Sequence, residues 1–167
     1  RYFKNYDFHN LYKELLNFCT VDLSAFYFDI RKDTLYCDPL SSQKRKSTLL
    51  VLNIILQCLL KWFAPILSFT TEEIYQLVSK KKNSIHLENF LNVPKKFENL
   101  ELNEKWSQLL KIRDVCNLSI EEKRASKEIG SSLEAAITIK INNKKLKILE
   151  GIDFAELCIT SSAEIKF

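Results

Sequence analysis

Residues 18–38 read FCTVDLSAFYFDIRKDTLYCD, and this stretch indicates what kind of fold the chain builds. We interpret Asp22 as the N-cap of a helix that runs through it. The apolar side chains behind that cap recur at the three- and four-residue spacing of an amphipathic helix, at Leu23, Phe26, Tyr27 and Ile30. The helix closes on a charged segment, DIRKD, followed by an aromatic residue. Charges of both signs at a helix end are typical either of a solvated surface or of a docking site for a polyanion.

The flanking sequence predicts a helix on each side of this one. From Phe8 onward, apolar residues again follow helical spacing, at Leu11, Tyr12, Leu15 and Cys19. Downstream, Pro39 disfavours helical geometry at the residue before it, so CDPLSS reads as a connector. Ser41 or Ser42 then caps a third helix that extends to about Ala64.

The third helix is apolar over most of its surface, apart from one polar line. Four-residue steps place Asn53, Gln57 and Lys61 on that line, so we expect a central helix that shows solvent a single edge. The run LLVLNIILQCLLKWFAPIL is also the segment most similar to a membrane span. The polar line interrupts it, and Pro65 ends it short of the ~20 apolar residues that a span needs. We therefore interpret it as a core helix of a protein without a membrane partner.

The rest of the chain predicts two further helices. Thr70 and Glu73 form a capping box for a short fourth helix. Residues 83–100 read as an extended connector, in which SIHLENF is a candidate short strand. A fifth helix follows and stops at Gly130, a natural C′ residue.

Beyond that helix, apolar and polar residues alternate as they do in a half-buried strand. We expect a first strand over residues 133–141 and a second in FAELCIT, with a helix or turn between them. The fold class is therefore mainly α, a helical bundle followed by a small α/β appendage. The predicted parts are the bundle, an extended connector, a junction helix and the appendage, at 1–82, 83–100, 101–130 and 131–167.

Composition narrows the classes of function. The net charge of +4 is a mild basic excess that permits a nucleic-acid partner. The five cysteines are dispersed without a CxxC pair, which favours reduced thiols in a cytoplasmic protein over a disulfide framework or a zinc site. Two glycines cannot build a phosphate-binding loop of the GxGxxG kind. Asp29 and Asp33 lack further metal ligands, and no active site is visible.

Because the chain opens on Arg1 and contains no methionine, we interpret it as a piece of a larger protein, and we expect a monomer.

Five segments, which keep their order along the chain, resemble those of one family. NFCTVDLSAFYFDIRKDTLYCD resembles the start of the anticodon-binding helical domain of bacterial isoleucyl-tRNA synthetases, and APILSFTTEEIY resembles a later signature of that domain. KRKSTLLVLNIILQCLLKWF fits the helix between them. KIRDVCNLSIEEKRASKEIGSSLEAAITI resembles the junction helix with the strand after it, and ELCITSSAEI fits the closing strand. Valyl- and leucyl-tRNA synthetases have a related bundle, but FYFDIRKDTLY together with IGSSLEAAITI favours the isoleucine enzymes.

The resemblance implies that the chain binds the anticodon stem-loop of tRNA(Ile) and is not catalytic by itself. It implies that the intact enzyme is a class I isoleucine–tRNA ligase, whose Rossmann domain makes isoleucyl-adenylate with ATP and Mg²⁺ and whose editing domain hydrolyses mischarged valine. The catalytic and editing domains of the same chain would then be partners of this region. Bacterial members often carry zinc on a cysteine cluster after this region, and no cofactor is expected on the residues of the piece itself.

The resemblance also makes the charged helix end a candidate tRNA site. An anticodon loop offers phosphates, which cations bind, and unstacked bases, which planar and amide groups bind. In a hairpin of the second and third helices, the short connector brings one helix end beside the next helix start. The predicted tRNA-binding residues lie at these two ends, at Arg31, Lys32, Tyr36, Gln43, Lys44, Arg45 and Lys46. Asp29 and Asp33 are predicted to position these cations.

From the residues alone, a structural or protein-interaction bundle without a nucleic-acid role stays open, because charges at helix ends are usually solvated. Two further basic runs, Lys80–Lys82 and Lys140–Lys147, would add to a long-range field, although lysine-rich loops often serve solubility. Trp62 and Trp106 fall on apolar faces, and we interpret them as core anchors.

Overall fold

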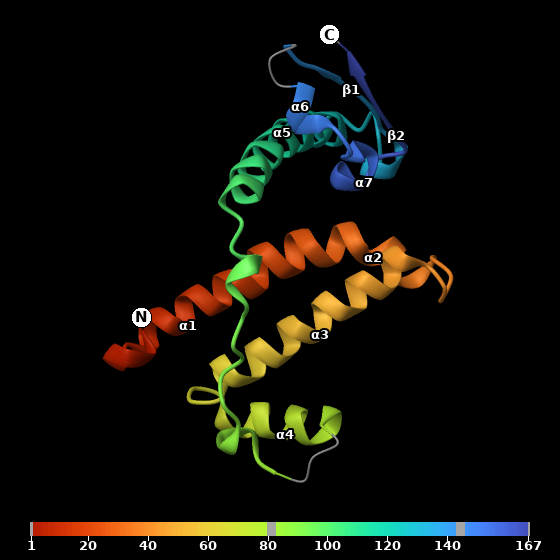
Figure 1. Cartoon of the computed structure of the whole chain (residues 1–167). Helices are drawn as coiled ribbons and strands as arrows, with labels where there is room; N and C mark the ends of the chain where they lie inside the picture. The colour runs from red at the N-terminus through yellow and green to blue at the C-terminus, as the bar shows by residue number, and fades with distance from the viewer. Residues whose placement is uncertain (1, 80–82, 143–145, 167) are drawn as a thin grey trace. The chain divides into compact units, whose positions relative to one another are not determined.

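The computed structural model describes residues 2–79, 83–142 and 146–166. Within these residues the protein is mainly α-helical and carries a small two-stranded sheet (Figure 1). The chain divides into two compact units, Arg1–Val93 and Pro94–Phe167, of which the second contains the sheet. The predicted fold class, a helical bundle followed by a small α/β part, is confirmed.

The first unit opens with a short turn, η1 (Phe3–Asn5), and then forms one uninterrupted helical rod (Figure 1). The rod consists of α1 (Phe8–Asn17), a π-helical stretch η2 (Phe18–Phe28) and α2 (Asp29–Tyr36). Asp7 caps its start, because the Asp7 carboxylate accepts the main-chain N–H three residues on at 3.2 Å.

The predicted N-cap at Asp22 is wrong, because Asp22 lies inside η2 on an exposed part of the rod. The backbone stays right-handed helical on both sides of η2, with φ −57° and ψ −45° at Phe18 and φ −65° and ψ −48° at Asp29. No glycine or proline occurs between residues 8 and 36, so no residue in the rod favours a break. The predicted inner face is confirmed in its main positions, because buried or half-buried residues of the rod include Leu11, Leu15, Leu23, Phe26, Tyr27 and Ile30.

The connector and the start of the third helix agree with the prediction. α2 ends three residues before Pro39, and α3 spans Gln43–Phe63. Ser42 is the N-cap of α3, because its Oγ accepts the Arg45 main-chain N–H at 3.3 Å. α2 and α3 contact each other and run in opposite directions, so they form a helical hairpin whose closed end is the 37–42 connector (Figure 1).

The described residues leave much of α3 uncovered, which contradicts the expected single solvent edge. Its most extensive contacts are with α2, α4 and the short turn η3 (Ile85–Leu87). Four apolar side chains in its first half are between 40% and 62% exposed, at Leu49, Leu50, Val51 and Ile54. Of the expected polar line, Lys61 turns inward instead, with its side chain only 10% exposed. The described neighbours therefore do not surround this 21-residue helix.

Among the described residues, α3 is the helix whose length and composition would suffice to cross a membrane. Core helices of globular proteins satisfy the same criterion. The contacts of α3 with α2 and α4, together with the buried Lys61 ion pair, are those of a helix inside a helical domain.

The fourth helix, α4 (Ser68–Val78), begins earlier than predicted, so the Thr70–Glu73 capping box is wrong. No side chain caps its first N–H groups, and Leu67 occupies the N-cap position. Glu72 instead reaches into the following connector, where its carboxylate accepts the Ser84 hydroxyl at 2.7 Å and the Ile85 N–H at 2.9 Å. The SIHLENF segment therefore forms the 3-10 turn η3 against α4, not a strand.

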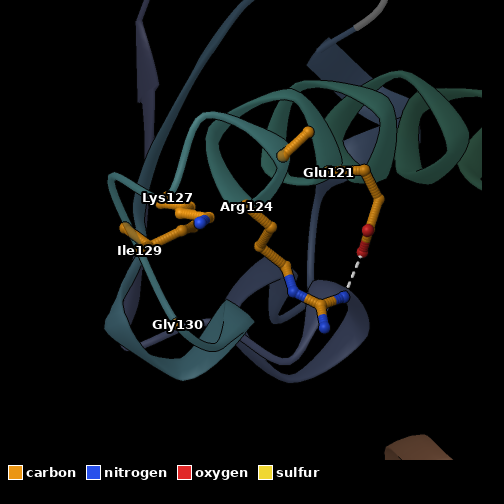
Figure 2. A pocket seen from close by; sticks show the side chains of 6 residues that line it. Glu121, Arg124, Lys127, Ile129 and Gly130 are labelled. Carbon is orange, nitrogen blue, oxygen red and sulfur yellow. Dashed lines mark hydrogen bonds and ion pairs between the residues drawn. The ribbon is translucent and has the colours of Figure 1, made fainter.

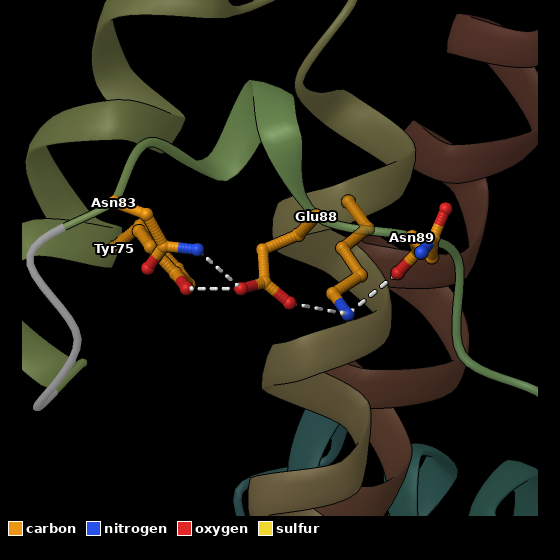
Figure 3. Close-up of polar contacts among 5 residues, drawn as sticks. Tyr75, Asn83, Glu88 and Asn89 are labelled. Carbon is orange, nitrogen blue, oxygen red and sulfur yellow. Dashed lines mark hydrogen bonds and ion pairs between the residues drawn. The ribbon is translucent and has the colours of Figure 1, made fainter.

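A small core closes the base of the hairpin, where α3, α4 and η3 meet. Its buried members are Leu60, Ala64, Tyr75 and Ile85. Beside this core, the Glu88 carboxylate accepts the Tyr75 hydroxyl at 3.0 Å and the Asn83 amide at 2.9 Å (Figure 3). Lys61 Nζ lies 3.7 Å from the other carboxylate oxygen and donates to the Asn89 carbonyl at 2.7 Å. This cluster fixes the connector against the two helices.

The second unit is built on one long helix, α5 (Leu100–Ala125), which follows the short turn η4 (Lys95–Phe97). Asn99 caps its start, because Asn99 Oδ1 accepts the Leu102 N–H at 2.9 Å. Trp106 is half-buried on α5 and Trp62 half-buried on α3, so neither is an exposed stacking platform.

α5 ends before Gly130, and the predicted C′ glycine is wrong. Lys127 takes the left-handed conformation instead, with φ 60°. Its N–H donates to the Arg124 carbonyl and the Glu128 N–H to the Lys123 carbonyl, both at 3.0 Å, which is the pairing of a Schellman motif. Gly130 lies in the loop beyond, where its N–H donates to the Glu134 carboxylate at 2.9 Å.

The sheet pairs β1 (Ala136–Lys140) with β2 (Ser162–Lys166) in parallel, from Ala136 opposite Ser162 to Lys140 opposite Lys166. β1 follows the short turn η5 (Ser132–Glu134), and its alternating burial confirms the predicted half-buried strand. The crossover carries α6 (Leu146–Leu149) and α7 (Phe154–Cys158).

The prediction of a strand in FAELCIT is therefore wrong. Asp153 caps a helix there, because its carboxylate accepts the Glu156 N–H at 3.1 Å. Ile159 ends that helix with φ 55°, and the strand begins three residues later. The core of the unit joins α5, β1, α6 and α7, with buried residues Leu109, Ile120, Ile139, Leu149, Phe154, Leu157 and Cys158.

Candidate nucleic-acid interface

The closed end of the α2–α3 hairpin, which we call the hairpin tip, is held by side chains of its own connector. Ser42 Oγ donates to the Asp38 carboxylate at 2.8 Å and also caps α3. Arg45 Nη1 donates to the Asp38 main-chain carbonyl at 2.6 Å. Arg45 therefore spans the connector from the first turn of α3. These contacts tie the end of one helix to the start of the next.

The structure brings all seven predicted tRNA-binding residues to this tip. Tyr36 is 82% exposed at the last position of α2, and Arg31 is half-buried one to two turns earlier. Arg45 is half-buried, and its Nε is buried without a hydrogen-bond partner. The remaining four side chains are exposed, at Lys32, Gln43, Lys44 and Lys46.

The two predicted positioning acids have different surroundings. Asp29 lies 3.9 Å from Lys32, in a pair whose side chains are 46% and 63% exposed. Such an exposed pair contributes little to stability and leaves the cation available to solvent. Asp33 is exposed on α2, where its main-chain carbonyl accepts the Cys37 N–H at 2.8 Å. The contact that holds Arg45 comes from Asp38, which sequence reasoning did not select.

Asp38 had a weak signal in the sequence. An aspartate before Pro39, followed by serines, is a common turn motif. The acceptor for Arg45 is nevertheless a main-chain carbonyl, which every residue carries. The contact therefore cannot be predicted from the type of residue at this position.

The chemistry of the tip suits single-stranded RNA. It presents lysines, an exposed phenol ring and an exposed side-chain amide on helix ends that are fixed to each other. Cations bind phosphates without reading sequence, while planar and amide groups can stack on and hydrogen-bond to unpaired bases. The N-terminus of α3 also directs its first N–H groups toward the connector, which favours a nearby anion.

The two other basic runs lie apart from the tip along the chain. Lys80–Lys82 falls outside the described residues, as do residues 143–145 of the second run. Lys140 is exposed at the end of β1, in the second unit.

A shallow hollow of about 480 Å³ at the end of α5 is electrostatically mixed (Figure 2). Its walls include Lys127, Ile129 and Gly130, together with Arg124. Arg124 Nη1 is already paired with Glu121 Oε1 at 2.6 Å. The arginine of this hollow is therefore paired with an acid of the same wall. Among the described residues there is also no group of three metal-ligating side chains.

Comparison with known proteins shows the family to which the chain belongs. Residues 1–140 match the family described as the anticodon-binding domain of tRNA ligase. The chain is 67% identical over 162 residues to the isoleucine–tRNA ligase of Pelagibacter ubique (strain HTCC1062), covering 97% of this chain and 18% of that protein. It is 46% identical over 166 residues to the isoleucine–tRNA ligase of Bartonella henselae, covering 99% of this chain and 17% of that protein.

The isoleucine–tRNA ligase of Agrobacterium fabrum is 45% identical over 161 residues, again with 17% of its length covered. The chain thus spans less than a fifth of the length of these curated relatives. The family match covers both the hairpin and α5, and ends with β1. The chain belongs to the family of anticodon-binding domains of tRNA ligases.

Proposed function

We propose that this chain is the anticodon-binding module of an isoleucine–tRNA ligase and that its hairpin tip contacts the anticodon stem-loop of tRNA(Ile). The observation that carries the proposal is the 67% identity to an isoleucine–tRNA ligase across 97% of the chain. The tip residues are Arg31, Lys32, Tyr36, Gln43, Lys44, Arg45 and Lys46.

Within the tip we assign two kinds of role. The exposed lysines, above all Lys32 and Lys46, bind backbone phosphates as point charges. Tyr36 and Gln43 face unpaired bases, because a ring stacks on any base and an amide offers both a donor and an acceptor. Arg45 holds the connector through Asp38 and adds charge behind the lysines. Asp29 limits the motion of Lys32, and Asp33 acts in the same way on its side of α2.

The chemistry of the intact protein lies in other parts of the chain. We propose that it is a class I ligase that joins isoleucine to tRNA with ATP and Mg²⁺. This module would act together with the catalytic and editing domains of the same polypeptide, as a monomer in the cytoplasm. A zinc module elsewhere in the parent is compatible with this assignment, and no step is assigned to zinc on the residues described here.

The test is binding of the chain to isoleucine tRNA and to the same tRNA with a changed anticodon, at two salt concentrations. We expect affinity to fall steeply with salt, because lysines release counterions when they bind phosphates. Changing Lys32→Ala together with Lys46→Ala should reduce the slope of log K against log[salt] by about 1 for each lysine. Fluorescence anisotropy with labelled tRNA measures both quantities.

The matched control is Lys4→Ala with Lys13→Ala, which removes two exposed lysines near the start of the first unit, one in η1 and one in α1. This variant has the same net charge as the tip variant, so a general field would lower affinity equally in both. Equal loss in the two variants, or no loss in either, contradicts the tip as the contact surface.

The anticodon change separates the remaining possibilities. Binding lost on the change identifies a base-reading module, whereas binding that ignores it means that the tip holds only the backbone. Preference for valine or leucine tRNA would assign the chain to one of those synthetases. No binding to any tRNA at low salt would favour a protein-interaction bundle instead.

A further inference from the structure

Two cysteines of the second unit, Cys116 and Cys158, meet where α5 packs on α7. Cys116 lies on α5 and is half-buried, and Cys158 is the last residue of α7 and only 3% exposed. The two helices contact each other, and Arg113 Nε donates to the Leu157 carbonyl at 2.9 Å. That bond joins a residue one turn before Cys116 to the residue just before Cys158. The two thiols lie close enough to interact, because hydrogen bonding with Cys158 is the largest influence on the pKa of Cys116.

Only one of the two sulfurs reaches open space. Cys116 lines an open cavity of about 1160 Å³ between α5 and β1, and Cys158 is not part of its lining. The apolar part of the lining includes Ile112, Val115 and Ile137. A small uncharged molecule can therefore approach Cys116, whereas Cys158 is only 3% exposed and does not line this cavity.

The interaction between the two thiols shifts their pKa values in opposite directions. It lowers the pKa of Cys116 to about 7, against the opposing effect of burial, because the donated proton stabilises the thiolate. Donating that proton and being buried both raise the pKa of Cys158. Arg113 is the charged group beside Cys158, and the charged groups along the cavity are Lys111, Glu122, Lys123, Glu134 and Lys140.

We propose that Cys116 and Cys158 form a peroxide-reactive dithiol site, in which Cys116 is the nucleophile and Cys158 the resolving thiol, and that its oxidation links α5 to α7 by a disulfide. The residues of this modification site belong to the second unit, whereas those of the proposed RNA contact belong to the first. The remaining thiols, Cys19, Cys37 and Cys58, all belong to the first unit.

The chemistry balances with hydrogen peroxide as the oxidant. The Cys116 thiolate attacks one peroxide oxygen, an S–O bond forms and the O–O bond breaks, and the departing hydroxide takes a proton to become water. The Cys158 thiol then gives up its proton, its sulfur attacks the Cys116 sulfur, and the S–O bond breaks to release a second water. Two thiols lose two electrons and one peroxide gains two.

The test uses the natural full-length protein, treated under native conditions with one equivalent of hydrogen peroxide and then alkylated and digested with trypsin. Cys116 falls in the fragment 114–123 and Cys158 in the fragment 148–166, and each fragment contains one cysteine. We expect mass spectrometry to detect these two fragments joined by a disulfide that dithiothreitol removes. In Cys158→Ser, the joined species is lost and a sulfenic acid at Cys116 is captured by dimedone instead.

Cys19 supplies the matched control in the untreated protein. It is half-buried like Cys116, but burial raises its pKa above the usual range. At pH 7 we expect Cys116 to react with iodoacetamide at least about fivefold faster than Cys19, because its larger thiolate fraction outweighs its weaker intrinsic nucleophilicity. The measurement needs no substitution, so a folding defect in a variant cannot obscure it.

Two results would overturn the proposal. One is alkylation of Cys116 no faster than that of Cys19. The other is oxidation of Cys116 to sulfinic or sulfonic acid without the joined fragments, which would mean that Cys158 cannot reach it.

Discussion

The two ends of α3 show how burial decides what a lysine does. Near its start, Lys46 is exposed at the hairpin tip. Near its other end, Lys61 is only 10% exposed and contacts Glu88 and Asn89. The first charge faces solvent and is available to a polyanion, while the second is used to hold a connector in place. Sequence periodicity treats both as polar positions on one helix, so the distinction comes only from the neighbours that each end acquires.

The same contrast holds for leucines, and this gives the largest expected effect. Leu60 is 3% exposed in the core at the base of the hairpin, and Leu50 is 62% exposed further up the same helix. We expect Leu60→Ala to lower the free energy of unfolding by about 3–4 kcal/mol, because it leaves a cavity. Leu50→Ala should lower it by less than about 1 kcal/mol. Urea unfolding followed by circular dichroism measures both, and equal losses would contradict the contrast between the two ends.

A second, somewhat smaller effect is expected from the buried lysine. Lys61→Met removes one partner of its ion pair with the Glu88 carboxylate, which is only 16% exposed, at a cost of about 3 kcal/mol in the free energy of unfolding. Lys46→Met removes an exposed lysine from the same helix and should change that free energy by less than about 0.5 kcal/mol. The same urea titrations compare the two variants. A Lys61→Met protein as stable as Lys46→Met would show that the ion pair is dispensable.

A substitution at the hairpin tip can weaken the contacts of the connector without removing a lysine or arginine. Ser42→Ala removes the N-cap of α3 and the contact with Asp38, and should cost about 1 kcal/mol. Ser41→Ala is the matched control, because Ser41 is exposed and does not cap the helix. If the tip binds RNA as a fixed surface, Ser42→Ala should weaken tRNA binding while the salt slope stays unchanged. A changed slope would mean that the cap variant has also displaced the lysines.

The smallest effect concerns pH at the base of the hairpin. The Ser84 hydroxyl, followed by the Gln76 amide, holds the pKa of the Glu72 carboxyl below its usual 4.5. A lowered folded-state pKa stabilises the fold at pH values above 4.5, and this stabilisation is lost as the pH falls through the folded-state value. Glu72→Gln should therefore have a lower Tm than the wild type at pH 7, and the difference should shrink in acid. If the difference in Tm between the two proteins stays constant from pH 7 to pH 3, the effect of the substitution comes from packing instead.

Much of the fold was predictable because its long elements have strong periodicity. The rod, α3, α5 and β1 each repeat their apolar residues often enough to define a period. α7 was missed because five residues are too few to distinguish a helix from a strand by period. The end of α5 was missed because Gly130 has the right chemistry for a C′ position, whereas Lys127 actually adopts the left-handed conformation.

The candidate site was predictable to a different extent. A short connector brings the end of α2 and the start of α3 together. The sequence order alone therefore predicted which residues lie at the tip. What holds the tip did not follow, because Arg45 binds a main-chain carbonyl of Asp38. The inward turn of Lys61 could not be predicted either. Its partners Glu88 and Asn89 lie 27 and 28 positions away along the chain, in a segment without periodicity.

The parallel pairing of β1 with β2 also constrains the order in which the second unit folds. Ser161 Oγ donates to the Ala135 carbonyl across 26 positions of chain, just before the two strands come into register. A parallel pair cannot form from a tight turn, so the strands meet only across the crossover with α6 and α7, and an ordered crossover lowers the entropy cost of that meeting. We therefore expect docking of α7 on α5 to precede the sheet and to set the folding rate of this unit. Contacts at the end of α7 would then govern how fast the unit forms as well as how stable it is.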